Sequence, residues 1–166
     1  MRRRTLLLVS TLSGIGMVAG ALTAFGAGGS RGTAVAVRVV DGDTLAVDGQ
    51  RIRLFGIDAP ERDQMCEAGG RSYACGRAAG EALARLIGDA RPACAERDRD
   101  PYGRSVAVCR IAGRDLNRAM VAEGWAVAYT RYSRDYVRDE AEARRARRGL
   151  WQGRFERPEQ YRVERR

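Results

Sequence analysis

Two aspartates, Asp43 and Asp58, are the residues of this sequence whose type and spacing most clearly suggest chemistry. Asp43 follows an Asp41-Gly42 bend, and Asp58 precedes Ala59-Pro60. Two carboxylates at the mouth of one apolar face would supply the oxygen ligands that hard cations such as Ca²⁺ prefer. Taken singly, each aspartate is better explained as an ordinary turn former, so the cation-site interpretation depends on the surrounding elements.

The elements that would position these aspartates are β-strands joined by an Asp48-Gly49 turn. Apolar residues alternate with polar ones on both sides of this turn, which predicts a β-hairpin of fixed register. In that register Val47 pairs with Gln50, Leu45 with Ile52, and Asp43 with Leu54. Asp43 therefore lies at the end of the apolar face. Asp58 emerges on the same face because it has the parity of Leu54.

The separation of the two aspartates requires the chain to bend. Asp58 lies four residues beyond Leu54, which is about 13 Å along a straight strand. Gly42 and Gly56 stand where they would permit such a bend. The two carboxylates can share an ion only if this bend forms.

Three further charged residues lie close to these segments in the sequence: Arg53, Glu61 and Arg104. Arg53 has the opposite parity to the shared face, so it would have to reach around a curled edge. Glu61 follows Ala59-Pro60, and Arg104 follows Tyr102-Gly103. Each is also consistent with a solvated surface side chain, and the residues alone leave these roles open.

The composition excludes several kinds of enzyme. The chain has 166 residues, with 30 basic against 21 acidic residues and a formal net charge of +9. Every basic residue is Arg, since the chain contains neither Lys nor His. This excludes Ser-His-Asp and Cys-His nucleophile systems, His-based zinc sites, Walker-type phosphate loops and Schiff-base chemistry. Catalysis must rest on Asp, Glu, Arg, Tyr, Cys and a bound ion.

The first 26 residues have the composition of an export signal. Three Arg at 2–4 precede an uncharged, largely apolar stretch over 5–25 that contains small residues near its end. This pattern predicts a cleaved signal peptide over 1–26, with a retained membrane anchor as the alternative. The body would then be periplasmic or secreted, or anchored in the inner membrane. Cleavage removes three Arg and no acid, so the charge falls from +9 to +6.

Four cysteines agree with an exported chain: Cys66, Cys75, Cys94 and Cys109. Their number alone leaves three pairings open. Residues 66–75 have a loop composition, and a turn-like segment over 98–103 separates the other two cysteines. The sequential pairs Cys66–Cys75 and Cys94–Cys109 are therefore favoured. A zinc site is the rival interpretation, but no two cysteines have the spacing of a ligand knuckle.

Short alternating strands interspersed with helical segments predict a small α+β barrel such as an OB-fold. We expect strands near 35–39, 44–47, 50–56, 91–97 and 105–111. Helices are expected over 74–87, from an Asp115 cap to Gly124, and from a Ser133 cap to about Arg148. These elements define one domain over 33–152, with a polar loop at 62–74 and a charged tail over 153–166.

Three motifs in combination resemble the signatures of the staphylococcal nuclease (thermonuclease) family. They are VVDGDT over 39–44, RLFGIDAPE over 53–61 and DPYGR over 100–104. The resemblance extends from about Val35 to Trp151 and implies an OB-fold, a five-stranded β-barrel with three α-helices. It also implies a calcium-dependent endonuclease that cleaves DNA and RNA with little sequence specificity and leaves 3′-phosphates.

The resemblance also implies roles for individual residues by motif position. The calcium ligands would be Asp43, Asp58 and the backbone carbonyl of Ala59. The catalytic residues would be Arg53, Glu61 and Arg104, and the aromatic residues contacting the substrate would be Tyr102 and Tyr129. Two Arg forks and a cation would stabilise the charge that develops on a phosphoryl oxygen, while Glu61 would activate or orient water.

The expected partners are DNA and RNA, single-stranded or unstacked, and a monomer with no obligate protein partner is expected. The main alternative is a catalytically silent OB-fold protein of the cell envelope that only binds nucleic acid. A silent relative would be expected to lack one of the arginines or the glutamate. This chain has the two aspartates and all three catalytic positions.

Overall fold

The structure is a computed structural model that describes residues 36–165. The signal peptide or anchor predicted for residues 1–26 lies outside these residues. Among the helices of residues 36–165, none is long and apolar enough to cross a membrane.

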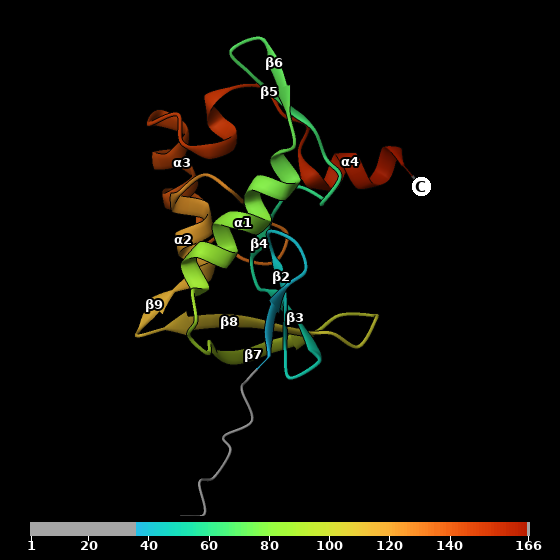
Figure 1. The fold of residues 1–166 in the computed structure, drawn as a ribbon, viewed down its shortest axis with the longest axis vertical. Coiled ribbons are helices and arrows are strands. Elements are labelled where there is room, and N and C mark those ends of the chain that lie inside the picture. Colours follow the sequence, from blue (N-terminus) through green and yellow to red (C-terminus); the bar gives the residue numbers. More distant parts are fainter. Residues whose placement is uncertain (1–35, 166) are drawn as a thin grey trace, which may run out of the picture. The chain divides into compact units, whose positions relative to one another are not determined.

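A mixed β-sheet forms the centre of the fold. Five strands lie in the order β1-β2-β3-β8-β7, and a short strand β9 (Arg114–Asp115) pairs with β8. The bounds of the five are Val37–Val39 (β1), Thr44–Val47 (β2), Gln50–Leu54 (β3), Ala93–Arg99 (β7) and Ser105–Ile111 (β8). Strands β3 and β8 are parallel, and the other neighbours are antiparallel. Figure 1 shows β7 and β8 at one end of the domain.

The β2–β3 hairpin has the register that the sequence predicted. Val47 pairs with Gln50 and Leu45 with Ile52. Asp48 and Gly49 have φ values of 50° and 82°, the left-handed conformation that a tight two-residue turn requires. The hairpin thereby fixes the end of β2 at which Asp43 lies.

The structure contains the three helices that the sequence predicted. They are α1 (Cys75–Ile87), α2 (Leu116–Ala122) and α3 (Val137–Arg145). The Asp115 side chain caps α2 as expected, accepting a hydrogen bond from the backbone N–H of Arg118. Ser133 does not cap α3: its hydroxyl accepts from the N–H of Asp135 in a preceding turn, and the helix begins later.

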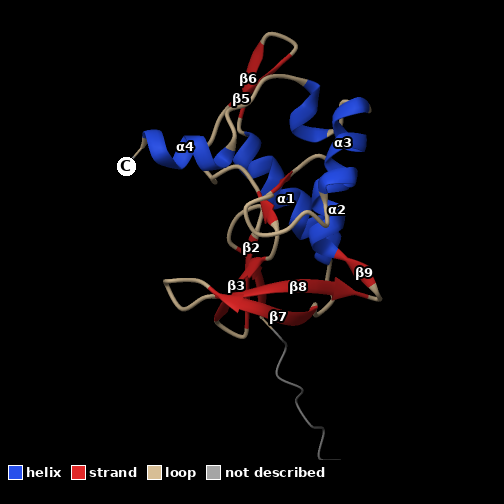
Figure 2. Cartoon of the chain, turned by 180° about the vertical axis from the view of Figure 1, so that it is seen from behind, coloured by secondary structure: helices blue, strands red, loops and turns tan. Residues whose placement is uncertain are grey.

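The apolar faces of α1 and α2 meet the sheet in one core. Leu83 and Met120 from the helices are fully buried in the same cluster as Leu45 and Leu54 from the sheet. Figure 2 shows the helices gathered on one side of the strands β3, β7 and β8. This core supports the end of β3, from which the chain continues into the bend at Gly56.

The segment expected to be a polar loop contains a short hairpin. Its strands are β5 (Cys66–Ala68) and β6 (Arg71–Tyr73), joined by a Gly69-Gly70 turn. The backbones of Glu67 and Arg154 exchange two hydrogen bonds of 2.9 and 2.8 Å, so β5 also holds the C-terminal segment.

The charged segment 153–166 contains a fourth helix that the sequence did not predict. A 3₁₀ turn (Gly149–Gln152) precedes it, and α4 spans Pro158–Glu164. Pro158 stands in the first turn, where its missing N–H costs nothing. Tyr161 is only 7% exposed, which anchors this otherwise charged helix. A local pattern of charges could not reveal that anchoring.

The two disulfides of the structure join the sequential pairs, Cys66–Cys75 and Cys94–Cys109. The first connects β5 to the start of α1, and the second links directly opposed residues of β7 and β8. Cys75 and Cys109 are fully buried. Disulfides of this kind indicate an oxidising compartment.

The first disulfide is predicted to hold the C-terminal segment in addition to stabilising the fold. Cys66→Ser/Cys75→Ser should lower the melting temperature by up to roughly 10 °C, since a loop of this size contributes about 3 kcal/mol. It should also speed amide exchange at Arg154 and in α4, because β5 carries the contact with that segment. Hydrogen exchange read by mass spectrometry measures both regions.

Cys94→Ser/Cys109→Ser is the matched control. It should lower the melting temperature comparably while leaving exchange in α4 close to that of the wild type. Equal exchange in α4 for both double variants would contradict the role assigned to the first disulfide.

Candidate functional site

A bend at Gly56 brings the two aspartates together. Gly56 has a φ of +72°, and a Cβ at this position would lie 3.0 Å from the Ser133 Cβ. Beyond the bend, β4 (Ile57–Asp58) pairs with β10 (Val127–Ala128). The chain then passes Asp43, whose Oδ2 accepts a 2.9 Å hydrogen bond from the N–H of Ala59. The bend thus removes the separation that a straight strand would impose.

Arg53 joins the two carboxylates. Its Nη1 donates to Oδ1 of Asp43 at 2.9 Å, and its Nη2 donates to Oδ1 of Asp58 at 2.8 Å. The Arg53 side chain is 18% exposed, whereas those of Asp43 and Asp58 are 4% and 1% exposed. One guanidinium therefore bridges two nearly inaccessible acids. Arg53 therefore reaches the face that carries Asp43 and Asp58, although the alternation of side chains along β3 would place it on the opposite face.

Burial controls the electrostatics of these acids. Desolvation raises the pKa of Asp58 above its ordinary value, and the negative charge of Asp43 acts in the same direction. The hydrogen bonds from Arg162 and the positive charge of Arg53 oppose that rise. Asp58 thus depends on cationic partners to hold its charge.

Asp41 is a third carboxylate of this cluster, which the sequence placed in the bend without assigning it a role. Its Oδ1 accepts a 3.1 Å hydrogen bond from the N–H of Asp43. Burial and the neighbouring Asp43 charge raise the pKa of Asp41 to about 6. Its position two residues before Asp43 was the sequence signal that could have identified it.

Glu61 is positioned by a buried glutamine. Gln64 is fully buried. Its side-chain Oε1 accepts a hydrogen bond from the backbone N–H of Glu61 at 3.2 Å, and its backbone N–H donates to the Glu61 carbonyl at 2.8 Å. Gly76 in α1 packs on the same carbonyl, because a Cβ there would lie 1.7 Å from it. Sequence reasoning missed Gln64, since nothing local distinguishes a buried glutamine from a loop residue.

Arg104 is fixed at the turn between β7 and β8. Oδ1 of Asp100 accepts the backbone N–H of Arg104 at 2.9 Å, and Oδ2 accepts its Nε. Against the effect of desolvation, these hydrogen bonds hold the pKa of Asp100 below its ordinary value. The ion pair orients the Arg104 guanidinium, which lies 5.8 Å from the centre of the Tyr102 ring.

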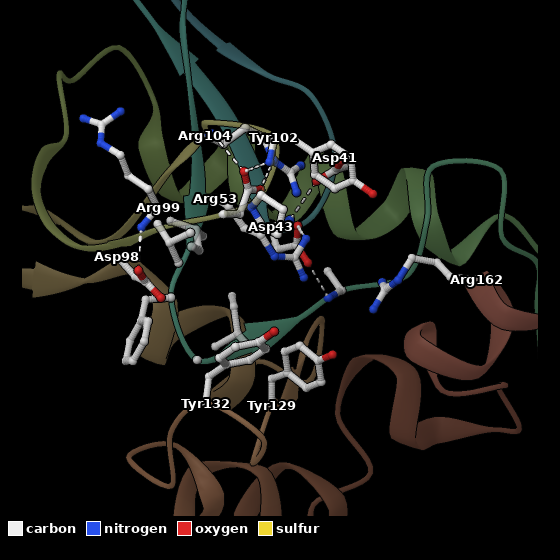
Figure 3. Close-up of a pocket in the computed structure, with 18 of the residues that line it drawn as sticks. Asp41, Asp43, Arg53, Asp98, Arg99, Tyr102, Arg104, Tyr129, Tyr132 and Arg162 are labelled. Atoms are coloured by element: carbon white, nitrogen blue, oxygen red, sulfur yellow. Dashed lines mark hydrogen bonds and ion pairs between the residues drawn. The ribbon is translucent and has the colours of Figure 1, made fainter.

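All these elements surround one cavity of about 450 Å³. Figure 3 shows Arg53 and Asp43 near its centre, Arg104 and Tyr102 on one wall, and Tyr129 and Tyr132 on the opposite wall. The rings of Tyr129 and Tyr132 pack edge-on with centroids 5.0 Å apart. Every residue that the sequence assigned to the metal, catalytic and aromatic sets lines this cavity, except Asp58, which is buried behind it.

Two of the cavity residues that the sequence prediction did not assign to the site come from distant segments. Tyr132, 60% exposed, is one of them. Arg162 of α4 is the other, and it forms ion pairs with Asp58 and Glu61. Both come from segments whose location depends on the tertiary fold, about 100 residues from Asp58 in the case of Arg162.

The donor chemistry of the cluster fits a hard divalent cation. Four carboxylates, Asp41, Asp43, Asp58 and Glu61, are accompanied by only two guanidinium groups in direct contact, those of Arg53 and Arg162. Burial first, and then the neighbouring Asp43 charge, raise the pKa of Asp41, and a bound cation would favour its charged form. Within residues 36–165, no three Cys, Asp or Glu side chains are gathered closely enough to hold an ion by themselves.

Comparison with known proteins places this site in a family context. A family model described as staphylococcal nuclease homologue matches residues 51–153. That range includes Arg53, Asp58, Glu61 and Arg104, and Asp43 lies before it.

Curated relatives have several different names. A micrococcal nuclease of Shigella flexneri is 35% identical over 132 residues, covering 69% of this chain and 71% of that protein. Protein ParB of Escherichia coli is 37% identical over 132 residues, covering 69% and 70%. The succinoglycan biosynthesis protein ExoI of Rhizobium meliloti (strain 1021) is 41% identical over 92 residues, covering 54% of this chain. This chain spans only about half of that relative, 48% of its length.

The raised pKa of Asp41 predicts a pH-dependent effect of Asp41→Asn on stability. The pKa of Asp41 is raised from its ordinary value of 3.8 to about 6 in the folded state. Protonated Asp41 therefore stabilises the wild-type fold at low pH, and this stabilisation is lost as the pH rises through 6. Asparagine cannot ionise and retains the Oδ1 acceptor. The free energy of unfolding of the variant, relative to that of the wild type, should therefore rise by roughly 2–3 kcal/mol between pH 4 and pH 7.

Denaturant unfolding with chelator present, at both pH values, measures this difference. Asp48→Asn, at the exposed hairpin turn, is the matched control for the chemical change. A stability difference between Asp41→Asn and the wild type that does not vary with pH would contradict the prediction.

Proposed function

The chain belongs to the staphylococcal nuclease homologue family, and from that membership we propose that it is a calcium-dependent endonuclease of DNA and RNA. It would hydrolyse phosphodiester bonds with little sequence specificity and leave 3′-phosphates. Relatives named micrococcal nuclease and uncharacterized endonuclease support a nuclease, whereas ParB and ExoI have other names. The OB-fold is the fold of this family, and the α+β sheet-and-helix architecture agrees with it.

The observation that carries the proposal is the buried pairing of Asp43 and Asp58 through Arg53 beneath an open cavity. Burying acids in this way has a large desolvation cost, and their mutual attraction to a single Arg recovers only part of it. A site that concentrates negative oxygens and guanidinium groups around a cavity is suited to bind a cation and a phosphate together.

Each side chain has a distinct role in the proposed reaction. Arg53 and Arg104 approach the cavity from β3 and from the β7–β8 turn, where both could bind the phosphoryl oxygens and stabilise their growing charge. Glu61 would orient or deprotonate the attacking water, because no His is present to do so. Gln64 and Asp100 hold Glu61 and Arg104 in these positions.

We assign Asp43, Asp58 and the carbonyl of Ala59 to hold Ca²⁺. When bound, the ion would supply positive charge beside the phosphoryl oxygens. Calcium takes six to eight oxygen ligands, so water and substrate would have to supply those that the protein does not.

The walls of the cavity suggest the form of the substrate. Tyr102 is 80% exposed, and Tyr129 stands across the cavity from it, so both offer faces for unstacked bases. The net charge of +9, or +6 without residues 1–26, favours approach of a polyanion and makes it salt-dependent. We infer an exported monomer that acts on single-stranded or unstacked DNA and RNA without an obligate protein partner.

Digestion of heat-denatured DNA and of RNA, with Ca²⁺ or with chelator, tests the proposal. We expect cleavage only with Ca²⁺, and fragments that phosphatase treatment converts to 3′-hydroxyl ends. Binding of single strands without cleavage would favour the catalytically silent envelope protein. Cleavage that persists in chelator would overturn the calcium requirement.

Arg53→Ala, Glu61→Gln and Arg104→Ala should each lower turnover at least about a hundredfold, because each residue acts on the transition state. Arg53→Ala should also lose stability, since it leaves Asp43 and Asp58 without their shared partner. Circular dichroism and single-turnover kinetics separate the two effects. Arg91→Ala, an exposed pair with Asp48, is the control; near wild-type turnover in any test variant removes that residue from the catalytic set.

Asp43→Ala and Asp58→Ala should each abolish measurable Ca²⁺ binding, because each removes a carboxylate ligand from an ion that has few protein ligands. Titration calorimetry at fixed pH measures the affinity. Asp48→Ala, at the exposed turn, controls for the loss of one negative charge. An unchanged affinity in either test variant would remove that aspartate from the ion site.

A further inference from the structure

Arg162 of α4 occupies the carboxylate oxygens at the centre of the site. Its Nη1 donates to Oδ1 of Asp58 and to Oε1 of Glu61, both at 2.9 Å. Its Nη2 donates to Oδ2 of Asp58 at 3.0 Å. The guanidinium therefore grips both oxygens of Asp58 and links that residue to Glu61.

The segment that carries Arg162 is anchored at several points. The Gln64 side-chain amide donates to the carbonyl of Glu156 at 2.7 Å, just before α4. Within α4, Tyr161 is buried, and Glu159 accepts a hydrogen bond from the Tyr129 hydroxyl at 3.1 Å. These contacts hold Arg162 beside Asp58, and the Arg162 side chain is only 28% exposed.

The oxygens that Arg162 takes are those that a cation would need. Oδ1 of Asp58 already accepts from Arg53 and Arg162, which uses both of its lone pairs. Oδ2 accepts from Arg162 as well. A guanidinium and a divalent ion on the same carboxylate would also repel each other as like charges.

We propose that Arg162 is the resident counter-cation of Asp58 and Glu61 and that it competes with the divalent ion for these oxygens, so that it sets the affinity of the ion. The inference rests on the proposed calcium site and concerns how that site is regulated. Without the ion, Arg162 keeps a 1% exposed carboxylate paired. With the ion, its guanidinium leaves Asp58, while Tyr161 and Pro158 can keep α4 packed.

Titration calorimetry of the full chain with Ca²⁺ tests the competition. Arg162→Gln removes the charge and keeps a polar but shorter side chain. We expect it to bind Ca²⁺ at least about tenfold more tightly than the wild type, since the ion no longer displaces charge-assisted hydrogen bonds.

Arg165→Gln is the matched control, because it removes the same charge from the residue that directly follows the same helix. Arg165 stacks on Tyr161 and does not contact Asp58 or Glu61. Its Ca²⁺ affinity should stay within about twofold of the wild type, as expected for an exposed charge. An equal gain in both variants would attribute the effect to general charge and overturn the proposal.

The outcomes distinguish this inference from the proposed function. Equal affinity of the wild type and Arg162→Gln, or weaker binding by the variant, overturns the competition while leaving the calcium site in place. Tighter binding by Arg162→Gln alone supports it, including the case in which the wild type binds too weakly to measure. Absence of binding by both proteins overturns the calcium site and the competition together.

A second measurement needs only the wild-type fold, in case Arg162→Gln does not fold. The Arg162 guanidinium resonances, assigned in ¹⁵N- and ¹³C-labelled wild-type protein by through-bond correlation to the Arg162 backbone, should be protected from exchange in chelator. Saturating Ca²⁺ should shift these resonances and remove their protection from exchange. The reference sample is kept in Mg²⁺-free buffer. Protected resonances that are unchanged by saturating Ca²⁺ overturn the proposal.

Discussion

The burial of Asp43 and Asp58 side by side is the constraint on which the rest of the site depends. Their side chains are 4% and 1% exposed, and two unpaired carboxylates at that depth would each cost several kcal/mol. Arg53 supplies a shared partner, the Thr44 hydroxyl donates to the same Oδ1 of Asp43, and the Ala59 N–H donates to its Oδ2. Because these donors come from β2, β3 and the chain after β4, the hairpin and the bend must both form before the acids can be buried.

The remaining functional groups are attached to this centre by elements that depend on it less. Arg104 is oriented within its own turn by Asp100, and the β7–β8 pairing would hold that turn wherever the hairpin docked. Glu61 follows directly from the centre, but its direction is set by Gln64 and by α1. The site thus combines a rigid floor of paired charges with walls that separate segments support.

The same arrangement explains why some of the site could be predicted and some could not. The Asp48-Gly49 turn fixes the hairpin register by local geometry, so parity correctly places Asp43 at the end of the buried face. Parity fails for Arg53, because a long side chain at the end of a strand next to a sharp bend can reach the opposite face. The start of α3 was misplaced for a related reason: Ser133 satisfies a turn before it could cap a helix.

Contacts between distant segments lie beyond any local pattern. Gln64 is recognisable only by the burial that β5, α1 and the segment before α4 impose on it. The sequence predicts a charged tail at residues 153–165 because most of their side chains are polar. Their order comes from contacts with distant residues, among them the β-bridge to Glu67 and the burial of the Tyr161 ring. Such interactions are set by the tertiary fold, which overrides composition.

The exclusive use of arginine matches the geometry of the centre. A guanidinium is planar and presents donors in a fixed fork, so Arg53 can offer one Nη to each of two carboxylates, and Arg162 can grip both oxygens of one. A lysine ammonium is a single strongly hydrated point charge and would have to lose more of its hydration to reach the same depth. Four clustered acids can therefore remain close together with two forks between them. With four carboxylates and two guanidinium groups in direct contact, negative charge remains uncompensated, and this charge leaves the cluster able to attract a further cation.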